Sequence, residues 1–149
     1  MNKIKTFIIL TLMMILSTPY HKGQTEEYII NKKIENKEIP YDVVKVTMYT
    51  VDPKQTDSTP LLTASGFKID SLNPEKHRII AVSRDLKMKY KFGTRVMVKG
   101  TGTHDGIYVV RDIMNKRWRN RIDILVNPNE TYNSFKGVKM YRIETYMTL

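Results

Sequence analysis

The chain has 149 residues and a mass of 17.5 kDa, which is enough for one domain with its own core and little more. It contains no cysteine, so disulfide bridges, thiol catalysis and cysteine-based metal sites are excluded. The formal net charge of +10 suits an anionic wall polymer, an anionic lipid surface or nucleic acid, and the sign alone does not choose among them.

The first segment has the layout of a secretory signal peptide. Lys3 and Lys5 precede the apolar run Thr6 to Ser17, "TFIILTLMMILS", and a polar stretch follows it. This run is too short to cross a bilayer as a helix, which takes about 20 residues. We therefore predict a signal peptide at residues 1–24, without a lipid-modified cysteine, and an uncleaved anchor is the alternative. In both cases the folded part is expected outside the cytoplasm, either periplasmic or secreted.

The rest of the chain reads as a short charged segment followed by one β-rich domain. Residues 25–41, "TEEYIINKKIENKEIPY", are predicted to be a linker or N-terminal arm, and residues 42–149 a single domain. Within that domain, apolar and polar residues alternate with a period of two in short stretches rich in β-branched and aromatic residues. These stretches are "DVVKVTMYT", "HRIIAVS", "TRVMVKG", "GIYVVRD", "NRIDILV" and "VKMYRIETYM".

Turn-forming residues separate these stretches, as in "TGTHDG" and "NPNE". Six short strands with few helical segments predict a small β-barrel. The best helix candidate is "SRDLKMKY", barely two turns long, with Ser83 available as its N-cap.

Two aspartates stand out in the stretch "VRDIMNKRWRNRIDI". Asp112 ends one predicted strand, and Asp123 lies inside another with Ile122 and Ile124 on the opposite face. Aspartate disfavours strands, and such local conflicts concentrate at functional sites. The alternative is that each aspartate forms an ordinary surface ion pair with a neighbouring arginine, and spacing alone does not decide between the two.

The order of several motifs resembles the three-aspartate (3D) domain. The motifs are, in chain order, "TMYT", "TASG", "IIAVS", "FGTRVMV", "YVVRD" and "NRIDI". This set is similar to the barrel of rare lipoprotein A and of membrane-bound lytic transglycosylase A, and it covers roughly residues 43–147. The resemblance implies a mainly β fold, a six-stranded double-psi β-barrel with one or two short helices.

The resemblance also implies an activity on peptidoglycan glycan strands. In lytic transglycosylases a carboxylic acid protonates the glycosidic oxygen between N-acetylmuramic acid and N-acetylglucosamine, and the resulting base takes the proton of the sugar's own 6-hydroxyl. Carried onto this chain, Asp123 is the expected acid and Asp112 its partner, and the swapped assignment stays open. No cofactor is expected, and three scattered histidines give a metal site little support.

The same resemblance suggests residues along a substrate groove. The expected substrate-binding residues are Thr47, Tyr49, Thr63, Ser65, Asp85, Arg117, Trp118 and Arg121. Ser83 stands where the family has its first aspartate, and Asp85 replaces that residue only if the backbone shifts. The family's glycine pair after the second aspartate is also missing, and Arg117 and Trp118 stand near it as a sugar-stacking or carboxylate-clamping wall. Ordinary turn chemistry for the hydroxyls and simple packing for Trp118 are the alternatives.

Two other functions remain open at this stage. A wall-polysaccharide-binding module without catalysis, like the expansin-like members of this fold, fits the missing aspartate and glycine pair. The segments "KMKYKFGTR" and "NKRWRNR" interleave cations with aromatic residues, as nucleic-acid-binding surfaces do, but export makes nucleic acid an unexpected partner. No stable membrane insertion is expected if the signal peptide is cleaved, and the sequence names no protein partner.

Overall fold

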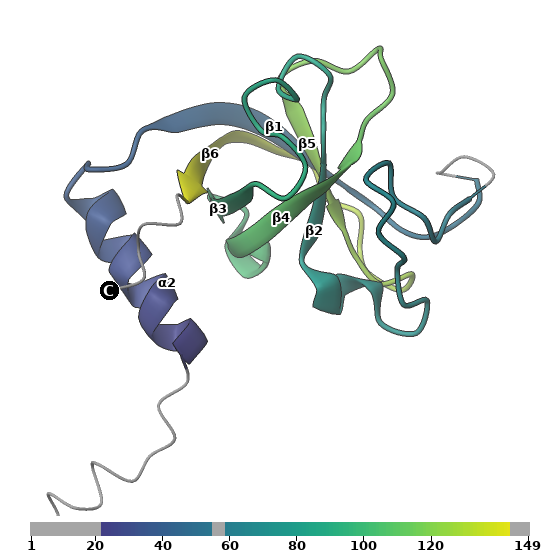
Figure 1. Ribbon diagram of the computed structural model, residues 1–149, viewed down its shortest axis with the longest axis horizontal. Coiled ribbons are helices and arrows are strands. Elements are labelled where there is room, and N and C mark those ends of the chain that lie inside the picture. Colours follow the sequence, from purple (N-terminus) through teal and green to yellow (C-terminus); the bar gives the residue numbers. More distant parts are fainter. Residues whose placement is uncertain (1–21, 55–58, 144–149) are drawn as a thin grey trace, which may run out of the picture.

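The computed structural model describes residues 22–54 and 59–143 (Figure 1). All but the end of the predicted signal peptide lies outside these ranges. The described chain forms one α-helix, α2 (Lys22–Glu35), and six strands: β1 (Tyr41–Tyr49), β2 (Ile79–Val82), β3 (Arg95–Lys99), β4 (Gly106–Ile113), β5 (Arg121–Leu125) and β6 (Phe135–Ile143). Two short 3₁₀ helices, η1 (Pro74–His77) and η2 (Gly102–His104), complete it. No helix in these ranges is long and apolar enough to span a membrane.

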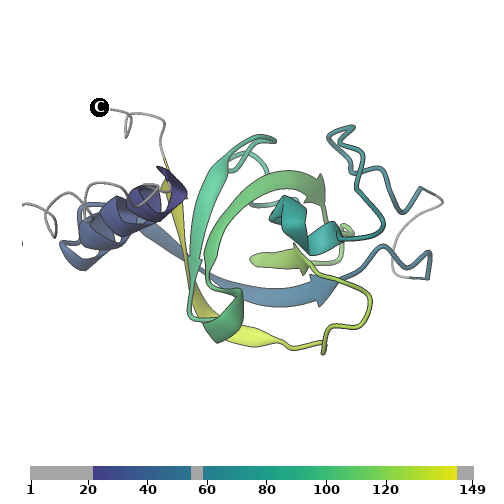
Figure 2. The same cartoon turned by 90° about the horizontal axis from the view of Figure 1, so that it is seen from below.

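The six strands form a closed barrel in the order β1-β5-β2-β4-β3-β6 (Figures 1 and 2). β1 is parallel to β5 and β4 is parallel to β2, whereas the other four pairings are antiparallel. If β1 is exchanged with β4, β2 with β5 and β3 with β6, the strand order and the parallel and antiparallel pairings stay the same. The two halves of the barrel are therefore related by a two-fold pseudosymmetry of topology. This is the arrangement of a double-psi β-barrel, and the mainly β fold class expected from the sequence is confirmed.

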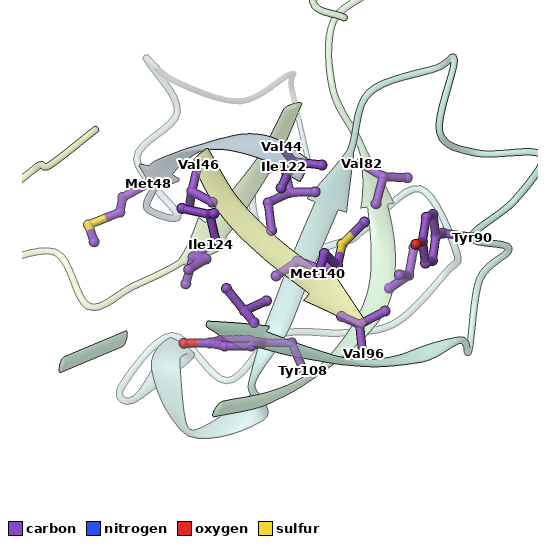
Figure 3. Close-up of a cluster of buried hydrophobic side chains, with 14 of the residues drawn as sticks. Val44, Val46, Met48, Val82, Tyr90, Val96, Tyr108, Ile122, Ile124 and Met140 are labelled. Atoms are coloured by element: carbon purple, nitrogen blue, oxygen red, sulfur yellow. The ribbon is translucent and has the colours of Figure 1, made fainter. Parts of the chain in front are cut away.

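Alternation along the strands produces the barrel core, as the period of two predicts. In β1, Val44, Val46 and Met48 are buried in the main hydrophobic cluster, and in β5 Ile122 and Ile124 join them (Figure 3). The intervening residues face outward. A second cluster lies on the outer face, where the loops on either side of β2 and β4 cover the strands, and it includes Tyr49, Ile69, Ile79, Ala81, Met114 and Leu125.

Helix α2 occupies most of the segment predicted as a linker or arm and packs beside β3 and β6 (Figures 1 and 2). Ile30 is fully buried in a small cluster with Met97 and Tyr141. Glu26 accepts hydrogen bonds from both terminal nitrogens of the Arg95 guanidinium. The helix therefore covers an apolar outer face of the barrel that would otherwise meet water.

The predicted helix at "SRDLKMKY" is wrong, because this segment forms a succession of turns. The Ser83 hydroxyl does not cap a helix: it accepts the backbone N–H of Arg121 at 3.1 Å, across the barrel end. Tyr90 turns inward instead of facing solvent, and its hydroxyl donates to Asp42. Contacts with β1 and β5 thus override the local helical preference of this stretch.

Candidate functional site

Four outward-facing residues form one row across neighbouring strands of the barrel. Thr47 of β1 pairs with Asp123 of β5, Asp123 pairs with Ala81 of β2, and Ala81 pairs with Asp112 of β4. Residues directly opposite each other share a face of a sheet, so all four side chains leave the barrel on the same side. At about 4.8 Å between strands, the Cα atoms of the two aspartates lie on the order of 10 Å apart, with only a methyl group between them.

A cleft of about 830 Å³ opens over this row. Its walls come from the loop before β2, around Thr59 to Ala64, and from the segment after β4, around Ile113 to Trp118. The first wall is held to β4 by two hydrogen bonds, from the Ser65 N–H to the Arg111 carbonyl at 3.1 Å and from the Ala64 N–H to Asp112 at 3.0 Å. The cleft residues are Tyr49, Thr59, Pro60, Leu62, Thr63, Ala64, Ala81, Arg84, Asp112, Ile113, Met114, Asn115, Arg117, Trp118 and Asp123.

The Asp123 carboxyl group is largely buried at the floor of the cleft. Its Oδ1 atom is inaccessible to solvent and finds no hydrogen-bond partner within the described ranges. Burial raises the pKa of Asp123 to about 6, against a hydrogen bond from Thr47 and the charge of Arg121, while the charge of Asp112 adds to the rise. Asp123 is therefore a carboxylic acid that exchanges its proton close to neutral pH.

The Asp112 carboxylate, in contrast, is surrounded by hydrogen-bond donors. Its Oδ1 accepts the N–H of Ala64 at 3.0 Å and that of Ile113 at 2.8 Å, and its Oδ2 accepts a long bond of 3.5 Å from the Tyr49 hydroxyl. Through these bonds the Asp112 carboxyl group holds the loop over the cleft.

Tyr49 connects the two aspartates electrostatically. Burial raises the pKa of its hydroxyl well above the usual 10.0, and the charges of Asp112 and Asp123 together with the hydrogen bond to Asp112 raise it further. The hydroxyl consequently stays protonated and remains a donor at any physiological pH.

An aromatic and basic wall stands beside the acidic row. Trp118 is half-buried and packs against the outer hydrophobic cluster. The guanidinium carbons of Arg121 and Arg117 lie 4.0 Å and 4.8 Å from the centre of its ring. Stacked guanidinium groups keep their charge while their planes are oriented by the ring. Arg84 and Arg117 are both exposed and line the cleft.

Some residues expected at the groove lie elsewhere or are already engaged. Asp85 is exposed outside the cleft, and its Oδ2 accepts the Asn120 N–H at 2.9 Å. The Thr63 hydroxyl bonds the Ser65 hydroxyl at 3.0 Å and accepts the Phe67 N–H at 3.1 Å, which is turn chemistry. Ser65 itself does not line the cleft. The structure therefore gathers Asp112, Asp123, Thr47, Tyr49, Thr63, Arg117, Trp118 and Arg121 in or beside the site and leaves out Asp85 and Ser65.

Ala81 and Arg84 are among the cleft residues that were not anticipated from the sequence. Ala81 separates the two aspartates, and the signal for it is an alanine among the branched apolar residues of "IIAVS". Arg84 carries no such signal, because its place in the cleft depends on the turns that follow β2. Among the described residues, no cluster of three or more histidine, aspartate or glutamate side chains could hold a metal ion.

Comparison with known proteins shows no family for this chain. No protein-family model matches the chain, and no curated protein sequence matches it. Among solved structures the chain is similar to Streptomyces papain inhibitor, at 18% sequence identity and a TM-score of 0.46, over 70% of this chain and 96% of that one. At this identity and TM-score the likeness carries no functional argument.

Proposed function

We propose that the protein is an exported lytic transglycosylase that cleaves the glycosidic bond between N-acetylmuramic acid and N-acetylglucosamine in peptidoglycan. The observation that carries this proposal is the Asp123 carboxyl group, buried at the floor of an open cleft with one oxygen lacking a partner among the described residues. A carboxyl group with a pKa of about 6 holds a proton at mildly acidic pH and releases it readily, as a general acid must.

The geometry supports a division of roles between the two aspartates. Asp123 protonates the glycosidic oxygen as the bond to the anomeric carbon breaks, which leaves Asp123 as a carboxylate and the sugar as an oxocarbenium-like species. In this proposal Asp112, held in the same row by the N–H groups of Ala64 and Ile113, stabilises that positive charge. Asp123 then takes the proton of the sugar's 6-hydroxyl group while the oxygen of that hydroxyl bonds to the anomeric carbon and closes the anhydro ring. No water is consumed, and the acid form of Asp123 is regenerated.

The opposite assignment, with Asp112 as the acid, is less compatible with the contacts. Two backbone N–H groups point at Asp112 Oδ1 and the Tyr49 hydroxyl at Oδ2, and a protonated carboxyl group would forfeit part of these bonds. Asp123 has the contrary environment, because burial without enough donors favours its neutral form. The swapped roles left open by the sequence are therefore resolved in our proposal in favour of Asp123.

A wall-binding module without catalysis is the second candidate, and one observation favours it. Ser83, at the position of the family's first aspartate, is fully buried and bonded to Arg121, and Asp85 lies outside the cleft. The site thus has two aspartates where the family has three. Nucleic-acid binding has weaker support, since Tyr90 is buried and Trp118 is already stacked with arginines, which leaves few free aromatic faces for bases.

The test is to incubate the purified protein with intact peptidoglycan and to search for soluble anhydro-muropeptides by mass spectrometry. Asp123→Asn should abolish their release, and Asp85→Asn, which alters an exposed aspartate outside the cleft, should release them at the parental rate. If no protein releases anhydro products while all still sediment with the wall, catalysis is refuted and the binding module is the better account.

A further inference from the structure

Two arginines at the edge of the acidic cleft have no carboxylate partner within the described chain. Arg84 and Arg117 line the cleft and are exposed, and neither pairs with a carboxylate among residues 22–54 and 59–143. Two arginines outside the cleft, in contrast, have internal partners. Arg95 pairs with Glu26, and Arg78 donates to the carbonyls of Asp105 and Ile107 while lying 3.9 Å from the Tyr108 ring centre.

The position of Arg117 is also partly fixed in advance. Its guanidinium stacks on Trp118, whose other contacts anchor the ring in the outer hydrophobic cluster and against Arg121. An arginine whose plane is already oriented loses less conformational freedom when it forms two parallel hydrogen bonds to a carboxylate. Freely solvated lysines such as Lys116, in the same segment but not in the cleft, lack this restraint.

A neutral glycan would gain little from such groups, because its hydroxyls and amides form weaker hydrogen bonds with guanidinium than a carboxylate does. Two aspartates at the floor would moreover repel an anionic strand, unless positive charge nearby compensates. Arg84 and Arg117 provide that charge at the rim of the cleft and leave the buried acid at the floor unneutralised.

We propose that Arg84 and Arg117 bind a carboxylate group of the glycan, so that the cleft selects strands with carboxylates beside the sugar rings over neutral strands with the same backbone. This inference rests on the proposed function and assigns the substrate class of that site. Two sources supply such a carboxylate in peptidoglycan: the lactyl group of muramic acid in strands without stem peptides, and the side chains and terminus of the stem peptide in strands that keep it.

The experiment measures binding rather than cleavage, with full-length Asp123→Asn protein and calorimetry. The ligands are neutral oligomers of N-acetylglucosamine, strands stripped of stem peptides, and strands that carry them. Adding Arg84→Ala and Arg117→Ala should weaken binding of a carboxylate-bearing strand by at least about ten-fold, as expected for lost charge-assisted bonds, and leave the neutral oligomer unaffected. The stripped and peptide-bearing strands then show which carboxylate is recognised.

The matched control adds Lys91→Ala and Lys116→Ala, which removes the same charge from two exposed lysines outside the cleft. Less than about three-fold weakening is expected there. Equal weakening in both double variants, or equal binding of neutral and carboxylate-bearing strands by the parent, would overturn the inference. If the parent protein releases anhydro products but the arginine substitutions do not weaken binding, only this inference is refuted. If the arginine substitutions weaken binding but the parent protein releases no anhydro products, only catalysis is refuted.

Discussion

Asp112 and Asp123 both lie opposite Ala81, one on each of the two strands that border β2. They occupy the same row and face the same cleft, yet their surroundings differ sharply. Asp112 accepts hydrogen bonds from the backbone N–H groups of Ala64 and Ile113. The Asp123 carboxyl group is largely buried, and one of its oxygens has no hydrogen-bond partner within the described ranges. Two chemically identical side chains in one row therefore have different hydrogen-bonding environments.

The first prediction concerns stability and pH. Because the folded-state pKa of Asp123 is about 6 and its ordinary value is 3.8, the folded protein binds this proton more tightly than the unfolded chain does. Its contribution is fully present below pH 3.8 and is lost as pH rises through about 6, by at most about 3 kcal/mol. Denaturant unfolding of Asp123→Asn should lack this loss between those pH values.

Asp85→Asn provides a control of opposite sign. Burial raises the pKa of Asp85, but hydrogen bonds from the Asn120 backbone and the Ser83 side chain outweigh it and lower the pKa overall. The stability that Asp85 contributes is therefore present above pH 3.8 and is lost as pH falls, so Asp85→Asn should change the pH dependence of stability only at acidic pH. An unchanged slope for Asp123→Asn between pH 3.8 and about 6 would contradict the burial of the Asp123 proton.

The second prediction concerns Tyr49. Tyr49→Phe removes the hydroxyl that donates to Asp112 over 3.5 Å but keeps the buried ring. Because this bond is long, we expect the free energy of unfolding to change by less than about 1 kcal/mol. The rate of anhydro-muropeptide release should fall by about ten-fold, since Asp112 loses one donor beside the reacting sugar. Tyr132→Phe, whose hydroxyl bonds Thr50 at 3.3 Å outside the cleft, should leave that rate unchanged.

The third prediction tests whether α2 belongs to the folded domain. Ile30 is fully buried between the helix and the barrel, so Ile30→Ala should lower the free energy of unfolding by about 2–5 kcal/mol. Ile29 is the neighbouring residue with 37% exposure, and Ile29→Ala should cost less than about 1 kcal/mol. Equal effects of the two substitutions in a denaturant titration would mean that the helix does not dock on the barrel.

The fourth prediction concerns Gly106, the first residue of β4. Its φ of +139° is a conformation that residues with a side chain rarely adopt, and an added Cβ atom would lie 2.5 Å from Nη2 of Arg78. Gly106→Ala should lower the free energy of unfolding by about 1–3 kcal/mol. A denaturant titration of the double variant Gly106→Ala and Arg78→Ala separates the close contact from the unfavourable backbone conformation, because it removes the contact with Arg78 but keeps the backbone strain. Full tolerance of Gly106→Ala would contradict the described backbone.

The strands and the two aspartates could be predicted from the sequence because their signals are local. Alternation placed Ile122 and Ile124 inside and Asp123 outside, and the structure confirms this placement. The helix at Lys22–Glu35 could not be predicted, because the segment is charged and polar and its packing depends on a few apolar residues such as Ile30 and Ile34. Its stability comes from contacts with strands about seventy or more residues away in the chain.

The composition of the site was only partly predictable for a similar reason. Thr63 and Asp85 are polar residues near family-like motifs, but turn geometry engages both in hydrogen bonds with backbone N–H groups. Ala81 and Arg84 enter the site through strand register and loop path, which no short motif encodes. The two acidic residues could therefore be predicted from residue type, whereas the residues around them could be identified only from the folded structure.

The two-fold relation of the strands has a last consequence for the row of Thr47, Asp123, Ala81 and Asp112. Exchanging the two halves of the barrel brings Asp123 onto Ala81 and Asp112 onto Thr47. A scaffold with identical halves would accept a linear polymer equally well in either direction. Here both acids belong to the second half and the methyl and hydroxyl groups to the first, so the two ends of the row differ chemically. Under the proposed function, the site would therefore bind a glycan strand in one direction better than in the other.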